Sequence, residues 1–134
     1  LSWEKADALD TGLKPKQFDG AVMAYGLRNL SDPVKGLREM KRLLKPGARA
    51  GILDFNRAPS GSKTANFQMF YLRNFVVPIS SLLGLREEYS YLEKSLINFP
   101  SGPLQESIAL KIGFKSASYR VFAAGQMGAL ILQA

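Results

Sequence analysis

The sequence predicts an α/β domain built on an open, mostly parallel sheet. Three observations favour this class: an apolar run at Phe18–Tyr25 typical of a buried parallel strand, a helical repeat of apolar residues after it, and a second apolar run at Ala48–Asp54. Strand, helix and strand in this order form a βαβ unit. With 134 residues, 46% of them hydrophobic and 22% charged, the chain has the composition of one globular domain.

The first half of the chain carries the signals of this unit in order. We expect a strand over Leu1–Leu9, a polar loop, and then a central strand at Phe18–Tyr25 that is covered on both faces. Ser31–Pro33 offers a helix N-cap with proline in the first turn, and Pro46–Gly47 should end the helix before the strand at Ala48–Asp54. The helical repeat consists of Val34, Leu37, Met40, Leu43 and Leu44.

The second half departs from this alternation before it returns to the sheet. Residues 60–100 predict a helical insertion over the sheet, in which Pro78 kinks or ends the first helix. A last helix at Leu104–Lys111 is opened by Pro103 and ended by Gly113. Two strands, Phe114–Phe122 and Met127–Leu132, should form an antiparallel hairpin that closes the sheet edge. We therefore divide one domain into residues 1–59, 60–100 and 101–134.

Composition excludes several kinds of chemistry. The chain has no cysteine and no histidine, which excludes thiol nucleophiles, disulfides and imidazole acid–base catalysis, and we expect no metal site. The net charge of +7 suits an anionic surface, or is simply a solvated basic face. No apolar run reaches the roughly 18 residues that a membrane span needs, so contact with a membrane would be peripheral.

The exit of the Phe18–Tyr25 strand carries the residue pair best suited to bind an oxygen-bearing ring. Arg28 and Asn29 follow the strand at the edge where open α/β sheets place their ligands. A guanidinium offers a rigid fork of donors to a carbonyl or a phenolate. Local sequence leaves a second interpretation open, in which Arg28 pairs with Asp32 or Asp54 and only tethers the loop.

Two further groups of polar residues have a local interpretation as well as a functional one. Asp54 ends the second strand and is followed by Asn56 and Arg57, which places polar side chains near the same edge, although an aspartate here also caps turns. Asp7 with Ala8, taken alone, is more typical of a turn than of a binding site.

Aromatic side chains recur at helical spacing in the insertion. The positions i, i+3, i+4, i+7 and i+8 are held by Phe67, Phe70, Tyr71, Asn74 and Phe75. Such a stripe is more often core packing than a ligand wall. Above a polar rim it would form the apolar walls of a pocket for a ring with a long hydrocarbon tail.

Together, these motifs resemble those of the UbiE/MenG type of quinone-biosynthesis C-methyltransferases, which methylate a prenylated quinol ring with S-adenosylmethionine. The resemblance extends from Asp7 to Leu132. It rests on Asp7–Ala8, Ala24–Asn29, Ile52–Phe55, Asn74–Pro78, Glu87–Leu92 and Gly125–Gly128. The last three stretches are most similar to the phylloquinone branch of cyanobacteria and plastids.

The resemblance implies a Rossmann-like class I methyltransferase sheet, S-adenosylmethionine as cofactor and a prenylated naphthoquinol as substrate. Its implied catalytic residues are Arg28 and Asn29, its implied cofactor-binding residues are Asp7, Ala8, Ala24 and Tyr25, and Asp54 matches an acidic residue of the family. Together with the aromatic stripe, this gives our expected substrate-binding residues: Asp54, Phe67, Phe70, Tyr71 and Phe75. It also implies a plastid or a cyanobacterial cytoplasm as the location, at the periphery of a membrane.

The glycine-rich cofactor loop of such enzymes has no counterpart in these residues. We therefore expect a sheet truncated at its N-terminal half, with an unpaired apolar edge along Phe18–Tyr25. The isolated chain should then be inactive, pair with another chain, for instance as a homodimer, or be a fragment of a longer protein.

Three other functions compete with this interpretation. The first is a non-catalytic, methyltransferase-like half that completes a sheet or scaffolds other enzymes. The second, a nucleic-acid-binding module, uses only the +7 charge and lacks an aromatic and basic platform, so we expect no nucleic acid partner. The third, a nicotinamide-dependent dehydrogenase, lacks its glycine-rich phosphate loop.

Overall fold

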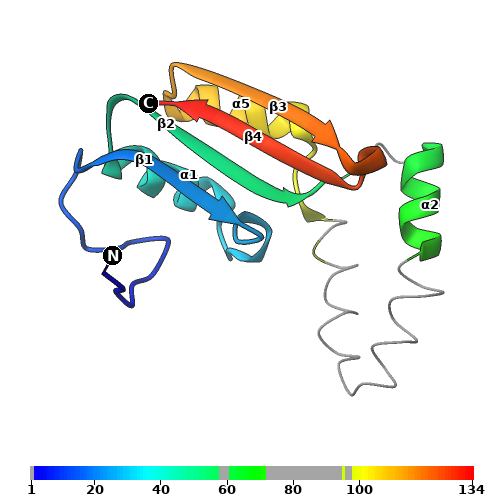
Figure 1. Cartoon of the computed structure of the whole chain (residues 1–134), viewed down its shortest axis with the longest axis horizontal. Coiled ribbons are helices and arrows are strands. Elements are labelled where there is room, and N and C mark those ends of the chain that lie inside the picture. The colour runs from blue at the N-terminus through cyan, green and yellow to red at the C-terminus, as the bar shows by residue number, and fades with distance from the viewer. Residues whose placement is uncertain (1, 58–60, 72–94, 96–97) are drawn as a thin grey trace.

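A four-stranded sheet organises the molecule (Figure 1). The computed structural model describes residues 2–57, 61–71, 95 and 98–134. The strands are β1 (Phe18–Ala24), β2 (Leu44–Phe55), β3 (Ser116–Phe122) and β4 (Met127–Gln133), in the order β1-β2-β4-β3. β1 and β2 are parallel, and β4 runs antiparallel to β2 and β3. The predicted α/β class, its parallel pair and its closing hairpin are confirmed.

Helix α1 (Pro33–Leu43) joins the two parallel strands and begins where the sequence predicts. Asp32 accepts a hydrogen bond from the backbone N of Lys35 at 2.9 Å, which satisfies a free donor of the first turn. The helix ends before the predicted stop at Pro46–Gly47, because the residue before a proline disfavours helical backbone. β2 instead begins at Leu44 and contains Pro46–Gly47 as an irregular stretch, with Gly47 at a φ of 80°.

The two 11-residue helices lie on one face of the sheet. α5 (Gly102–Ile112) ends at Gly113, whose φ of 102° is the left-handed cap that the sequence predicts. α1 and α5 contact each other, and Figure 1 shows both behind the sheet. The core between helices and sheet consists of Leu27, Leu37, Met40, Leu44, Ala50, Ile52, Phe99, Ala109, Phe114, Leu130 and Leu132.

β1 is an edge strand, not a strand covered on both faces. Among the described residues, β1 pairs only with β2. Val22 exposes 91% of its surface, and Phe18 and Tyr25 expose 41% and 45%. The prediction of burial on both faces is therefore wrong for the described residues, because α1 and α5 lie on the same face of the sheet and no described helix covers the other face. Among the described residues, the second edge of β1 is unpaired, and its apolar residues Phe18 and Val22 are exposed.

The N-terminal segment is a turn and not the predicted strand. The side chain of Asp7 accepts a hydrogen bond from the backbone N of Leu9 at 2.9 Å, and its carbonyl accepts one from Asp10 N at 3.1 Å. An aspartate that bonds the backbone two residues on stabilises a turn against an extended chain. The expected strand over Leu1–Leu9 is therefore wrong for residues 2–9.

The described part of the insertion contains one helix, α2 (Lys63–Tyr71). Figure 1 places α2 beyond the carboxyl ends of β1 and β2. Its first turn lies beside the 3₁₀ turn η3 (Ala123–Gly125), because a Cβ built on Gly125 would come 2.5 Å from Thr64 Cγ2. The helices predicted after Pro78 lie outside the described residues, and the division of the chain at residues 59 and 100 stays a prediction. Within the described ranges, no helix has the length and apolar character to cross a membrane.

Candidate ligand site at the carboxyl ends of β1 and β2

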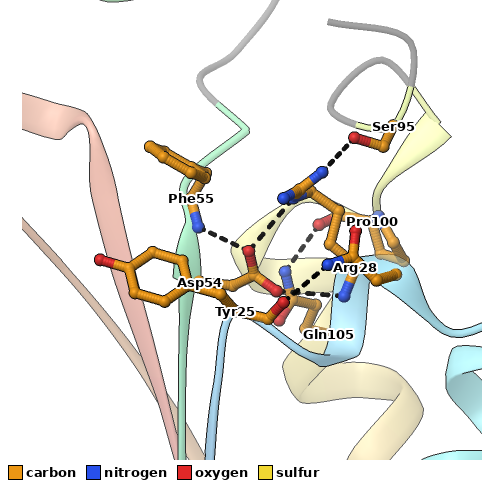
Figure 2. Close-up of polar contacts among 8 residues, drawn as sticks. Tyr25, Arg28, Asp54, Phe55, Ser95, Pro100 and Gln105 are labelled. Carbon is orange, nitrogen blue, oxygen red and sulfur yellow. Dashed lines mark hydrogen bonds and ion pairs between the residues drawn. The ribbon is translucent and has the colours of Figure 1, made fainter. Parts of the chain in front are cut away.

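Polar groups converge where the two parallel strands end. The backbone N of Tyr25 donates to the carbonyl of Leu53 at 2.7 Å, so the two strand ends lie together. The short 3₁₀ turn η1 (Leu27–Asn29) then brings Arg28 onto Asp54 at the end of β2. Arg28 donates to this carboxylate twice, from its backbone N at 3.0 Å and from Nε at 3.2 Å (Figure 2).

Arg28 and Asp54 form a buried ion pair. Their side chains expose only 4% and 5% of their surface. The guanidinium also donates from Nη1 to the hydroxyl of Ser95 and lies 5.7 Å from the ring centroid of Phe55 (Figure 2). The sequence leaves two partners open for Arg28, Asp32 and Asp54. The structure pairs Arg28 with Asp54, because Asp32 caps α1 instead. The other N–H donors of the guanidinium have no partner among the described residues.

The chain turns sharply between β1 and η1. Tyr25 has a φ of 55°, a left-handed conformation that costs a residue other than glycine about 1–3 kcal/mol. Asn29 holds this turn, because its Nδ2 donates to the carbonyl of Tyr25 at 2.8 Å, and the rings of Tyr25 and Phe55 lie 5.6 Å apart. The exposed side-chain oxygen of Asn29 has no partner within the described part of the chain, which leaves it open to a ligand. Ala24, just before the turn, is also exposed.

A second polar network supports the residues that follow Asp54. Asn56 is buried, its Nδ2 donates to the carbonyl of Gly125 at 2.9 Å, and its Oδ1 accepts from the hydroxyl of Tyr119 at 3.1 Å. Burial raises the pKa of Tyr119 to about 12, with a further contribution from the negative charge of Asp54. The sequence places Asn56 near this edge but gives no sign of Tyr119, because 63 residues separate the two and no spacing marks the contact.

Ala8 faces a separate cavity of about 280 Å³ along β1. Glu39 of α1 forms part of its wall and accepts hydrogen bonds from the backbone N and Oγ1 of Thr11 at 3.0 and 2.6 Å. The hydrogen bonds from Arg42 are the main cause that lowers the pKa of Glu39 to about 2, against the opposing effect of burial. The cavity is lined by Ala8, Thr11, Leu13, Phe18, Gly20, Ala21, Val22, Met23, Gly36, Glu39, Met40, Leu43 and Leu44.

The structure thus divides the predicted site residues into two groups and leaves some apart. Tyr25, Arg28, Asn29 and Asp54 come together at the strand ends, with Ala24 next to them in the chain. Ala8 lines a cavity that reaches Met23, one residue before Ala24, whereas the exposed carboxylate of Asp7 bonds Leu9 N.

The aromatic stripe is only partly described. Phe67 and Phe70 of α2 expose 60% and 56% of their surface, which argues against core packing for these two rings. Tyr71 ends α2, and nothing of its side chain is described; Phe75 lies outside the described residues. The part of the chain that the structure describes contains no group of three or more acidic side chains placed to hold an ion.

Solved structures with the same arrangement define the class of fold. A methyltransferase of Thermotoga maritima that depends on S-adenosylmethionine aligns with a TM-score of 0.65 at 18% identity, over 97% of this chain and 62% of that one. One from Archaeoglobus fulgidus aligns with a TM-score of 0.65 at 13% identity, over 98% and 66%. The fold is therefore that of the S-adenosylmethionine-dependent methyltransferases, as expected from the Rossmann-like resemblance.

Sequence comparison then gives the family. The ubiE/COQ5 methyltransferase family matches residues 1–131, and the chain belongs to this family. A 2-phytyl-1,4-naphtoquinone methyltransferase of Nostoc sp. is 48% identical over 132 residues, which are 98% of this chain and 57% of that protein. The chloroplastic 2-phytyl-1,4-beta-naphthoquinone methyltransferase of Arabidopsis thaliana is 39% identical over 98% of this chain and 50% of that protein. The chain thus spans little more than half the length of these relatives.

Proposed function

We propose that this chain is the substrate-activating part of an S-adenosylmethionine-dependent C-methyltransferase whose substrate is a prenylated naphthoquinol. The observation that carries the proposal is the buried Arg28–Asp54 pair beside the exposed amide of Asn29, at the strand edge where this fold binds its ligands. Family membership and the activities for which the relatives are named support the reaction and the substrate class.

The residues present fit part of the proposed cofactor. The cavity beside Ala8 and Met23 is mostly apolar, and its volume of about 280 Å³ is close to the lower end of the roughly 300–1,000 Å³ of ligand pockets. This volume suits a flat heterocyclic base better than a whole cofactor, and Asp7 directly precedes Ala8, which lines the cavity. S-adenosylmethionine supplies a methyl group on a positively charged sulfur.

Arg28 and Asn29 would prepare the ring for attack on this methyl group. A quinol ring carbon becomes nucleophilic as a neighbouring hydroxyl loses its proton, so the protein must stabilise negative charge on that oxygen. Asp54 fixes the guanidinium of Arg28 in one orientation, and the N–H donors that have no partner among the described residues can then face the ring oxygen. The exposed oxygen of Asn29 can accept a hydrogen bond from the second ring hydroxyl and so align the ring.

The prenyl tail would lie against α2. Phe67 and Phe70 offer exposed aromatic surface beyond the carboxyl ends of β1 and β2, the edge that holds Arg28 (Figure 1). A substrate with a long hydrocarbon tail resides in a lipid bilayer, so we infer peripheral contact with a membrane on this side, in a plastid or in a cyanobacterial cytoplasm. The chloroplastic relative and the cyanobacterial relatives support this location. The roles of Tyr71 and Phe75 in the same wall are part of this proposal.

Cofactor binding would require a neighbour along β1. Within the described residues, β1 has one edge without a neighbouring strand. A row of unpaired backbone donors and acceptors there, next to Val22 with 91% exposure, is a template for a further strand. We infer that residues equivalent to the rest of the relatives pair there. A second copy of this chain could pair with the same edge, but it would repeat the part already present.

Turnover and cofactor affinity of two variants test the proposal. Asn29→Ala changes an exposed side chain and should lower kcat for methyl transfer to a reduced demethyl-naphthoquinol about 100-fold, with little change in the Kd of S-adenosylmethionine. Arg28→Ala should lower kcat at least as much. Asp19→Asn, at the start of β1, is the matched polar control and should leave both constants unchanged. Equal losses of kcat and cofactor affinity in Asn29→Ala would refute the assigned role.

A further inference from the structure

A basic hollow opens at the amino end of β2, at the other end of this strand from the candidate ligand site. Its volume is about 540 Å³, and it is lined by Pro15, Lys16, Arg38, Lys41, Arg42, Leu44, Pro46, Ile112 and Ala134. Ten residues of β2, about 30 Å of strand, separate Leu44 in this hollow from Asp54 at the candidate ligand site. The proposed reaction makes no use of it.

The hollow is built by the turn before β1, helix α1, the start of β2, the end of α5 and residue 134. Arg38, Lys41 and Arg42 occupy positions i, i+3 and i+4 of α1, so they share one side of the helix. Lys16 comes from the preceding turn, where it has a left-handed φ of 56°, and its backbone N donates to the carbonyl of Arg42 at 2.9 Å. The backbone N of Gln17 donates to Leu43 O at 2.9 Å, which fixes the same turn against the end of α1.

The positive charge of the hollow is largely uncompensated. Glu39 engages Arg42 through two contacts of 2.7 Å. Lys16, Arg38 and Lys41, in contrast, have no ion-pair partner among the described residues. Cations in the last turns of α1 complement the helix dipole, but Lys16 lies outside the helix and converges on the same hollow.

Opposing charges are fewer than the cations. The carbonyl ends of α1 and α5 carry partial negative charge, and a carboxylate at Ala134 would offset one unit. The negative charge of Asp10 also acts on Arg42 and contributes to its raised pKa. These groups leave Lys16, Arg38 and Lys41 with a net attraction for an anion.

We propose that the basic hollow binds a soluble phosphate ester whose organic part is compact and apolar. Phosphate accepts charge-assisted hydrogen bonds from several cations at once, as Lys16, Arg38 and Lys41 would offer. The volume exceeds what a bare phosphate needs, and Pro15, Pro46 and Ile112 give the hollow apolar surface. The hollow lies at the amino end of β2, whereas Phe67 and Phe70, which would face the proposed membrane, lie beyond the carboxyl end. A soluble ligand therefore fits the geometry better than a lipid headgroup.

Calorimetric titration of the protein in its complete form tests this site. Phenyl phosphate should bind more tightly than inorganic phosphate, and the double variant Lys16→Gln/Lys41→Gln should weaken its binding about tenfold or more. The control Lys5→Gln/Lys35→Gln removes the same charge from exposed positions outside the hollow and should change nothing. Melting temperature and methyl transfer should be unaffected in both variants.

Two outcomes would overturn the proposal. The first is equal affinity for phenyl phosphate in the two double variants. The second comes from flotation with phosphatidylglycerol vesicles: membrane binding that Lys16→Gln/Lys41→Gln abolishes, without any binding of phenyl phosphate, would assign the hollow to a lipid headgroup.

Discussion

Replacing Arg28 by methionine tests whether burial or distance decides the strength of an ion pair in this protein. Methionine keeps an unbranched apolar stem but removes the guanidinium from the carboxylate of Asp54, whose side chain is 5% exposed. Two backbone donors survive the change, since residue 28 N and Phe55 N donate to this carboxylate at 3.0 and 2.8 Å. The charge of Asp54 therefore stays buried with fewer partners.

The expected cost follows from this burial. Removing one partner of a buried pair costs about 3–5 kcal/mol, and the two surviving backbone donors place Arg28→Met near 3 kcal/mol. Lys45 and Asp19 form the comparison, because their N···O distance of 2.7 Å is shorter than the 3.2 Å of Arg28 and Asp54. Their side chains, however, expose 46% and 85%. Water screens such a pair, so Lys45→Met should cost less than about 1 kcal/mol.

Urea denaturation followed by far-ultraviolet circular dichroism gives both values on the protein in its complete form. In 1 M salt the small effect of Lys45→Met should shrink further, whereas the effect of Arg28→Met should persist. If the two substitutions lower the free energy of unfolding by similar amounts, distance and not burial sets the strength of these pairs, and the reasoning fails.

Three further predictions concern titration and packing. Arg42 holds the pKa of Glu39 near 2, below its usual 4.5, so the stability that this pair adds above pH 5 should disappear as the pH falls to 2. This pKa difference would correspond to roughly 3 kcal/mol, but water screens Arg42, whose side chain is 37% exposed, so we expect about 1 kcal/mol. Glu39→Gln should abolish this part of a profile of urea midpoint against pH. Burial, and to a smaller extent the charge of Asp54, raise the pKa of Tyr119 to about 12. The contribution of the neutral Tyr119 to the free energy of unfolding should therefore be complete below pH 10 and should fall as the pH rises toward 12. A spectrophotometric titration in which every tyrosine ionises by pH 11 would contradict this. Gly128→Ala should lower the free energy of unfolding by about 1–3 kcal/mol, because its Cβ would collide with the hydroxyl of Tyr119, and Tyr119→Phe in that background should recover part of the loss.

Local signals in the sequence determined the elements of the sheet layer and their order. Asp32 and the proline after it mark the start of α1 because a side-chain acceptor and a missing N–H both suit the first turn. Gly113 marks the end of α5 because its left-handed conformation costs glycine little. The apolar run of β1 and the closing hairpin were equally readable, since strand pattern and turn lie within a few residues of each other.

Only the tertiary structure decided which of these elements meet and what they leave exposed. Arg28 bonds Asp54 across 26 residues and not the nearby Asp32, because the parallel pairing of β1 and β2 brings their ends to one edge. Tyr119 reaches Asn56 across 63 residues for a similar reason, through the hairpin register. Whether the second edge of β1 is paired depends on residues that lie beside it in space. The apolar run of β1 looks the same in the sequence for a paired strand and for an unpaired one, so only the structure shows the edge without a partner among the described residues.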